Sequence, residues 1–391
     1  MNGLITNLQI STHSRRCVED YLTSLGISPE NFHGKIADQD EMFHKAIAVK
    51  HPVDFAYFKY IESGRRTHDV MEQFYQHYFG GPHQIGSVLE FASGHGRATR
   101  FMIQSIPADR VWVSDIYSDA MSFQESYLKV NTIQSVEHPD KFECDRKFDL
   151  ITAMSLFTHL PEDIFGKWLA KLGSLLEKDG VLVVTAREAE TVTGTRNIDG
   201  IEERGIVYEL RSESSSLSTD IYGLTTVTDE FMRRMIAEFI SPKANIHVFR
   251  RGLYLNQDVY AISLRDPVAF TPLDLKRPPT GGRAPQWISV NSGREFQIFG
   301  WVVDMNVGHE IVAVDVYIDN VRFGQAEFHP YRNTDFAKHF PGFENEPKSW
   351  SVRLPADLLR PESIVKFRVK CDTGASIEYY APPADLLHTA S

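Results

Sequence analysis

The chain has 391 residues, a formal net charge of −11 at pH 7 and three cysteines. This length allows two or three domains with a sizeable core in the largest, and the acidic balance argues against nucleic acid as a partner, because the overall field does not attract phosphates. The cysteines, Cys17, Cys144 and Cys371, lie far apart, which supports neither a disulfide framework nor a zinc cluster and favours a reducing compartment. The first residues lack a basic region followed by an apolar core, and no apolar run is long enough to cross a membrane. We therefore expect a cytoplasmic protein, with peripheral membrane association left open.

The first eighty residues are expected to be mostly helical. Within them, Met71–Phe79 carries apolar side chains at helical spacing, which predicts a helix that packs beside a sheet. The aromatic residues Tyr57 and Tyr60 lie further upstream, together with Arg65. Aromatic stripes at helical spacing usually serve the core, so helix packing is the simplest interpretation of the tyrosines.

The next segment joins a short apolar strand to an acid and two closely spaced glycines. Ile85–Phe91 forms the apolar run, and the chain must then turn sharply before helical spacing resumes over Arg97–Ile106. Gly94 and Gly96 let the backbone approach a ligand, as in a loop that binds a nucleoside cofactor. A dinucleotide fingerprint would end in glycine or alanine, where this chain has Thr99. NAD is therefore disfavoured.

Strands and helices alternate beyond this loop. Arg110–Asp115 predicts a strand that ends in a carboxylate about twenty residues after the glycines, where an acid can accept both ribose hydroxyl hydrogens. Lys147–Pro161 and Trp168–Thr185 predict a strand, an amphipathic helix, an Asp-Gly turn and a fully apolar strand. Thr225–Ile236 opens like a capping box, and Asn256–Ser263 alternates as an antiparallel strand would. This order is typical of repeated βαβ units.

The pattern changes after a proline-rich segment. Residues 266–285 contain prolines and adjacent glycines that exclude a helix or a central strand, so this segment is expected to be an extended linker. The chain then shows short alternating runs, Glu295–Val303, Ile311–Ile318 and Ile364–Lys370, each bounded by turn residues. They predict an all-β sandwich over residues 286–385.

From Glu90 to Ser263 these motifs resemble, in order, those of the class I methyltransferases that depend on S-adenosylmethionine (SAM). The first motif of that family is roughly acid-x-Gly-x-Gly-x-Gly, and Glu90–Gly96 departs from it only at Ala92. The resemblance covers residues 50–265 and implies an α/β fold, a Rossmann-like sheet with helices on both faces, with SAM as the cofactor. It implies that the following residues contact SAM: Glu90, Phe91, Ala92, Gly94, Gly96, Asp115, Ile116, Met154 and Ser155.

The resemblance also implies an organisation of the chain. Residues 81–265 would form the SAM-binding core, and residues 1–80 would form a helical lid or cap, with Tyr57, Tyr60 and Arg65 over the methionine end of SAM. The tail resembles an immunoglobulin-like module appended to bacterial glycosyltransferases and to enzymes of surface-polysaccharide assembly, in the stretches Phe299–Asp304, Ile318–Gly324 and Tyr331–Pro341. A structural spacer is the plain alternative for this tail.

Methyl transfer needs an aligned nucleophile and, for a hydroxyl, a group that takes its proton. His159 is the first candidate base because imidazole titrates near neutral pH. The alternative is that His159 and Thr158 simply cap or orient the next helix. Glu188 is the second candidate. Together with Arg187 and Glu190 it could bind a polar substrate, although charged loop residues are usually solvated. No compact metal motif is present in the sequence, so no metal is expected.

The sequence therefore predicts an enzyme, a SAM-dependent methyltransferase that forms a methyl ether on a sugar of a bacterial surface glycan or its precursor. Two alternatives stay open. One is an O- or N-methyltransferase of small-molecule biosynthesis, with the β module serving to form a homo-oligomer. The other is a scaffold that binds SAM or a glycan without catalysis. In each enzymatic interpretation the partner is a carbohydrate or another small-molecule acceptor.

Overall fold

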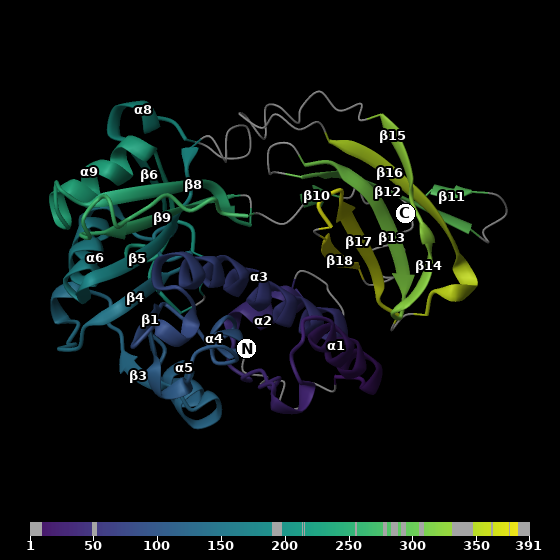
Figure 1. Cartoon of the computed structure of the whole chain (residues 1–391), viewed down its shortest axis with the longest axis horizontal. Helices are drawn as coiled ribbons and strands as arrows, with labels where there is room; N and C mark the ends of the chain where they lie inside the picture. The colour runs from purple at the N-terminus through teal and green to yellow at the C-terminus, as the bar shows by residue number, and fades with distance from the viewer. Residues whose placement is uncertain are drawn as a thin grey trace. The chain divides into compact units, whose positions relative to one another are not determined.

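The computed structural model shows two compact units, and Figure 1 displays their helices and strands. The residues described are 10–48, 53–189, 198–212, 214, 216–254, 256–276, 280–282, 288–290, 295–304, 309–330, 347–360, 363–374 and 376–381. The large unit comprises His33–Glu41 and Ser63–Leu275. The small unit comprises Met1–Phe32, Met42–Glu62 and Lys276–Ser391. The first turns of the long helix α3, Val53–Phe79, thus group with the C-terminal strands and its remainder with the large unit.

A seven-stranded sheet forms the centre of the large unit, in the order β3-β2-β1-β4-β5-β9-β8. Its strands are β1 (Val88–Phe91), β2 (Val111–Asp115), β3 (Asn131–Gln134), β4 (Phe148–Ala153), β5 (Leu176–Ala186), β8 (Asn245–Leu253) and β9 (Gln257–Ser263). The strands from β3 to β5 pair in parallel, and β9 runs antiparallel to both β5 and β8. The chain runs outward from β1 to β3 and then returns to β4 on the other side of β1, so the strand order reverses between β1 and β4.

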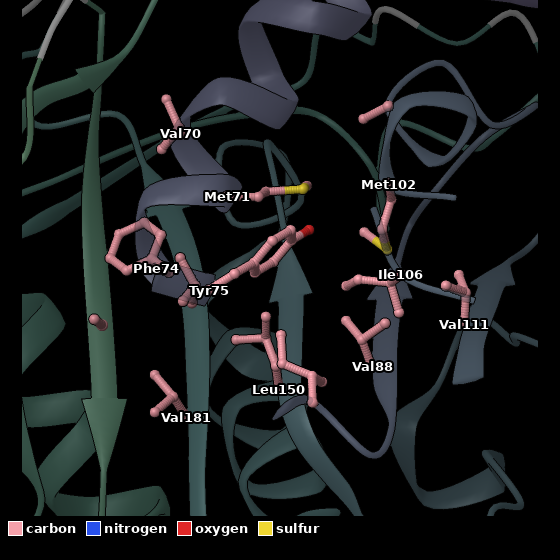
Figure 2. Close-up of a cluster of buried hydrophobic side chains, with 14 of the residues drawn as sticks. Val70, Met71, Phe74, Tyr75, Val88, Met102, Ile106, Val111, Leu150 and Val181 are labelled. Atoms are coloured by element: carbon pink, nitrogen blue, oxygen red, sulfur yellow. The ribbon is translucent and has the colours of Figure 1, made fainter. Parts of the chain in front are cut away.

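Apolar side chains cover both faces of this sheet, because strands of a buried parallel sheet point apolar residues to both sides. On one face, Met71, Phe74 and Tyr75 of α3 pack over strand residues such as Val88 and Leu150, as Figure 2 shows. On the other face lie α6 (Glu162–Ser174) and α9 (Asp229–Phe239). The predicted Rossmann-like sheet with helices on both faces is confirmed.

Shorter elements complete the large unit: α4 (Thr99–Met102), α5 (Ser118–Phe123), a π-helical stretch over Gln124–Leu128, α8 (Ile201–Arg204), and the antiparallel pair β6 (Ile206–Glu209) and β7 (Leu224–Val227). Short 3₁₀ turns lie at Pro82–Gln84, Ala108–Arg110 and Pro139–Lys141. Helix α9 begins as the sequence predicts, because the side chain of its N-cap residue Thr228 accepts a hydrogen bond from the backbone N–H of Phe231.

The small unit contains antiparallel strands in two sheets. One has the order β10-β12-β16-β15, with β11 also pairing with β12, and the other has the order β14-β13-β17-β18. The strands are β10 (Thr280–Gly282), β11 (Ile288–Val290), β12 (Glu295–Val303), β13 (Ile311–Ile318), β14 (Val321–Gln325), β15 (Glu327–Pro330), β16 (Lys348–Pro355), β17 (Val365–Cys371) and β18 (Ser376–Ala381). A 3₁₀ turn lies at Ala356–Leu358. Residues of both sheets share one apolar core, in which the rings of Trp350 and Phe367 lie 5.0 Å apart. The predicted all-β region is present.

N-terminal helices belong to the same unit as these strands. They are α1 (Thr12–Ser24), α2 (Glu41–Ala48) from Met42 onward, and the start of α3, with a 3₁₀ turn at Pro29–Asn31. In α1, Asp20 accepts a 2.9 Å hydrogen bond from the side chain of Asn320, in the turn between β13 and β14. These helices and the C-terminal strands thus belong to one compact unit although they lie at opposite ends of the chain. Tyr57 and Tyr60 are buried, and the ring of Tyr60 lies 5.9 Å from that of Phe43, which is helix packing.

The proline-rich segment packs against the large unit in its first part and forms a short strand further on. Residues 266–275 form neither helix nor strand, as expected, but Phe270 and Leu275 are buried in the large unit. The ring of Phe270 stacks 4.8 Å from Tyr78 and 4.2 Å from His247. Further on, Thr280–Gly282 forms the edge strand β10, and a proline-rich segment can supply an edge strand because one side of it needs no partner. No helix of the described residues is both long and apolar enough to span a membrane.

Candidate active site

The loop after β1 contains three residues with left-handed backbone conformation. Ala92, Gly94 and Gly96 have φ values of 59°, 56° and 77°. A Cβ on Gly94 would meet no atom within 4 Å, so this glycine borders open space, whereas a Cβ on Gly96 would lie 2.5 Å from the side chain of Leu128. Gly94 therefore leaves room for a ligand and Gly96 is required by packing. Ala92 replaces the first glycine of the family motif yet keeps the conformation that glycine favours, at a strain of about 1–2 kcal/mol.

Asp115 links this loop to the end of β2. Its Oδ2 accepts a 2.7 Å hydrogen bond from the N–H of Gly94, and its Oδ1 accepts one of 3.2 Å from the N–H of Tyr117. Burial raises the pKa of this carboxyl group, and the backbone hydrogen bonds oppose the rise. The neighbouring Ile116 is half-buried. An acid held at the carboxyl end of β2, beside the glycine loop, matches the place the sequence predicts for it.

Glu90 and Phe91 lie deeper than the loop. Glu90 is 6% exposed and its Oε2 accepts a 2.6 Å hydrogen bond from the hydroxyl of Thr99. Burial raises the pKa of Glu90 to about 7. The ring of Phe91 packs 4.8 Å from that of Trp168 on the α6 face of the sheet, so its side chain belongs to the core. In the same loop, Nε2 of His95 lies 3.1 Å from a carboxylate oxygen of Asp119.

The chain also turns sharply at the end of β4, where Met154 and Ser155 are half-buried. Ser155 has a φ of 65°. Its N–H donates a 2.7 Å hydrogen bond to the hydroxyl of Thr185, the residue before the end of β5, and its Oγ lies 3.0 Å from the amide nitrogen of Gln257 on β9. The sequence indicated Met154 and Ser155 as cofactor contacts after the fourth strand. It did not indicate Thr185 and Gln257 as partners of Ser155, because Asn256–Ser263 was interpreted only as a strand.

His159 follows four residues later and is 5% exposed. Its Nδ1 lies 2.7 Å from the carbonyl oxygen of Gly223, and its ring stacks 4.4 Å from that of Tyr222. Since a carbonyl only accepts hydrogen bonds, Nδ1 carries a hydrogen, and in the neutral ring the lone pair is on Nε2.

The alternative that His159 or Thr158 caps the next helix is wrong. Helix α6 has Pro161 at its N-cap and no side-chain cap, and the hydroxyl of Thr158 instead donates a 2.6 Å bond to the carbonyl of Ser155.

Charged residues beyond β5 are buried rather than solvated. Arg187 is 6% and Glu188 5% exposed. The carbonyl of Arg187 accepts a hydrogen bond from the N–H of Val227, and Glu188 forms a single bridge with the same residue of β7. The expectation that these two charged side chains are solvated is therefore wrong. Glu190 lies outside the described residues.

One group of potential metal ligands occurs among the described residues, formed by His68, Asp69 and Glu72 of α3. The guanidinium of Arg65 already pairs with both carboxylates, at 2.5 Å from Asp69 and 3.3 Å from Glu72. Burial lowers the pKa of His68 to about 3, so this histidine is neutral at physiological pH. The arginine already supplies the positive charge that a metal ion would supply here.

A family model and several solved structures are similar to parts of this chain. A family model described as a methyltransferase domain matches residues 89–182, which include the glycine loop, Asp115 and His159. No curated protein matches the chain. The structure described as the DhpI–SAM–HEP complex is 16% identical, over 57% of this chain and 92% of that chain, with a TM-score of 0.38.

Two further solved structures are similar. The glycopeptide N-methyltransferase MtfA complexed with sinefungin is 13% identical, over 50% of this chain and 94% of that chain, with a TM-score of 0.36. The magnesium protoporphyrin IX methyltransferase (ChlM) from Synechocystis PCC 6803, with bound SAH (S-adenosylhomocysteine), is 15% identical, over 64% of this chain and 99% of that chain, with a TM-score of 0.38.

Residues 89–182 of the large unit therefore match a methyltransferase domain, and the sheet that contains them has the Rossmann-like strand order. The chain thus carries the domain of an enzyme that transfers methyl groups.

Proposed function

We propose that SAM binds at the carboxyl ends of β1, β2 and β4, where the strand order reverses, because ligands of open α/β sheets bind at such switch points. In this arrangement the backbone at Gly94 approaches the cofactor, and Asp115 accepts the two ribose hydroxyls. The hydrogen bond between Asp115 and the Gly94 N–H carries this proposal, because it holds the ribose acid and the glycine loop together before a cofactor arrives. Glu90, Ala92, Gly96, Ile116, Met154 and Ser155 line the rest of the site, and Phe91 contributes its backbone.

The acceptor in this proposal is a sugar hydroxyl of a bacterial surface glycan, of the O-antigen or capsule type, or its nucleotide- or lipid-linked precursor. Support comes from the sequence of the tail, which resembles immunoglobulin-like modules of surface-polysaccharide enzymes, and from the antiparallel strands that this tail forms. The domain boundaries at residues 80, 265 and 285 belong to the same proposal. So does the lid formed by residues 1–80.

His159 is the proposed general base. The hydroxyl oxygen of the acceptor attacks the methyl carbon, the carbon–sulfur bond of the sulfonium breaks, and the proton of the hydroxyl passes to Nε2 of His159. The Gly223 carbonyl supports this assignment, since it holds the hydrogen of the imidazole on Nδ1 and leaves the lone pair on Nε2. Glu188 is the alternative base, and its burial at the end of β5 suits a carboxylate aimed at a site rather than at solvent.

A SAM titration followed by a methyl-transfer screen tests the proposal. The acceptor panel contains nucleotide sugars, lipid-linked sugars, peptides and small phenols, each with tritiated SAM. We expect label in a sugar methyl ether. Label only in a peptide amine or a phenol would move the acceptor to small-molecule biosynthesis. SAM binding with no product on any acceptor would favour the non-catalytic scaffold.

A further inference from the structure

Ser155 holds a conformation that its own chemistry does not favour. Its φ of 65° lies in the left-handed region, where a residue with a Cβ is strained by about 1–2 kcal/mol. It stands directly after Met154, at the carboxyl end of β4 and beside the proposed cofactor site. Such strain persists only where the surroundings over-determine the backbone, so neighbouring groups must hold Ser155 in place.

Two buried polar side chains hold it. The N–H of Ser155 donates to Oγ1 of Thr185 at 2.7 Å, and that oxygen lies 2.6 Å from Oε1 of Gln257. The amide nitrogen of Gln257 lies 3.0 Å from Oγ of Ser155, which closes the ring of hydrogen bonds. Gln257 is 6% exposed and Thr185 is fully buried, so water competes little for these bonds.

The direction of each bond follows from the donors available. Because the backbone N–H of Ser155 must donate, Thr185 Oγ1 accepts, and the hydroxyl hydrogen of Thr185 is directed to Gln257. This makes Oε1 of Gln257 an acceptor and leaves its Nε2 as the donor toward Ser155. The position therefore suits a side chain with two polar atoms, one that accepts from Thr185 and one that bonds the hydroxyl of Ser155, whose oxygen also lies 3.2 Å from Oε1 of Gln257.

The effect reaches beyond Ser155. The carbonyl of Ser155 accepts the hydroxyl of Thr158, and the next residue, His159, is fixed through Gly223. The turn that leads from β4 to His159 therefore begins beside Ser155, the residue that Gln257 restrains.

We propose that Gln257 is a positioning residue of the methyltransferase site: it holds Ser155 in the left-handed conformation and thereby sets the course of the Met154–His159 segment beside SAM. The proposal rests on the proposed SAM site, since Met154 and Ser155 are assigned to that site. Gln257 itself touches no reacting atom.

Binding of SAH to the full chain, followed by calorimetry, tests the proposal without an acceptor. In the isosteric variant Gln257→Glu, one carboxyl oxygen can still accept from Thr185, and the other can bond the Ser155 hydroxyl, as donor when protonated and as acceptor when ionised. Burial raises the pKa of such a carboxyl group. We therefore expect the ratio of the variant's SAH dissociation constant to that of the wild type to stay within about threefold at both about pH 5 and about pH 8.

Two further variants keep the test decisive. Gln257→Met, which fills similar space without hydrogen bonds, should weaken SAH binding roughly tenfold at every pH. Adding Ser155→Gly to it should restore part of that loss, because glycine adopts the left-handed conformation unaided. Gln297→Glu is the matched control: this strand glutamine of the small unit also donates to a serine hydroxyl, at 3.4 Å, and its ratio should stay near one at both pH values.

The outcomes separate the two proposals. If the wild type fails to bind SAH, the assigned cofactor site is wrong whatever Gln257 does. If the wild type binds and Gln257→Met binds equally well, the positioning role is wrong. Weakened binding in Gln257→Met that Ser155→Gly does not rescue would show that Gln257 does not act through the backbone of Ser155, which also overturns the proposal.

Discussion

The two strands at the centre of the sheet leave it in the same backbone conformation but by different means. After β1 the left-handed residue is Ala92, and after β4 it is Ser155. Ala92 has no polar side chain, and its loop is held by a backbone bond from Ser93 to Ser114 and by the side chains of Asp115 and Gln124, which bond Gly94. Ser155 is held by buried side chains from β5 and β9 and bonds one of them through its own hydroxyl. Both walls of the proposed site therefore use buried side chains, but only at Ser155 does the side chain of the left-handed residue itself take part.

This difference separates the functions that each wall can serve. The β1 wall, with Asp115, should control cofactor affinity, and the β4 wall should contribute to cofactor affinity through Met154 and Ser155 and control proton transfer through His159. Substitutions in each wall test this distinction.

The largest effect is expected on the β4 side. His159→Ala should lower turnover on a sugar acceptor about a hundred-fold, because general-base contributions commonly reach that size, and should leave SAM affinity nearly unchanged. Single-turnover rates on folded variant protein measure this. Near wild-type rates would transfer the role to Glu188 or to release of the proton to water.

Asp115→Ala, on the β1 side, should have the opposite signature. Loss of a carboxylate that binds two hydroxyls removes about 1.5–3 kcal/mol per charged hydrogen bond, so SAH should bind at least about tenfold more weakly in calorimetry. Unchanged affinity would reject the ribose role of Asp115. Asp119→Ala, in the same region but exposed in its side chain, is the comparison variant.

A smaller effect on the β1 side should follow from Gly64→Ala in α3. A Cβ at Gly64 would lie 2.1 Å from the carbonyl oxygen of Arg97, just beyond the glycine loop. Because backbone must move to admit it, and overpacking costs about 1–3 kcal/mol, we expect SAH to bind roughly tenfold more weakly.

The matched control is Gly173→Ala in α6, whose Cβ would meet only side-chain atoms of Ile240, at 3.1–3.4 Å. It should leave SAH affinity unchanged. Equal affinities in the two variants would mean that α3 does not support the loop.

The smallest effect distinguishes the two left-handed residues directly. Ala92→Gly removes strain of about 1–2 kcal/mol and adds about 0.4–1 kcal/mol of chain entropy to the unfolded state, so a net stabilisation of roughly 0.5–1 kcal/mol is expected in chemical denaturation. Ser155→Gly removes similar strain but also the hydroxyl that bonds Gln257, so it should gain less or lose stability. Equal gains at both sites would contradict the difference between the two walls.

The sequence alone indicated the glycine loop and the strand-terminal Asp115, but it did not indicate the partners of Ser155. Glycines and the strand-terminal Asp115 are local signals, because conformation and charge there depend on residues close in the chain. Gln257 acts on Ser155 across 102 residues, and no local pattern indicates that pairing. The helix-capping alternative for His159 failed similarly, since its partner Gly223 is distant in sequence.

The position of β9 in the chain has a consequence for biosynthesis. The strand that carries Gln257 lies between β5 and β8 in the sheet, yet it is made after both of them. A ribosome that has released residues up to β5 has therefore supplied the glycine loop and Asp115 but not the glutamine that restrains Ser155. Because chains fold as they emerge, amino-terminal parts first, the nascent methyltransferase can complete its two walls only when its last large-unit strand enters the sheet.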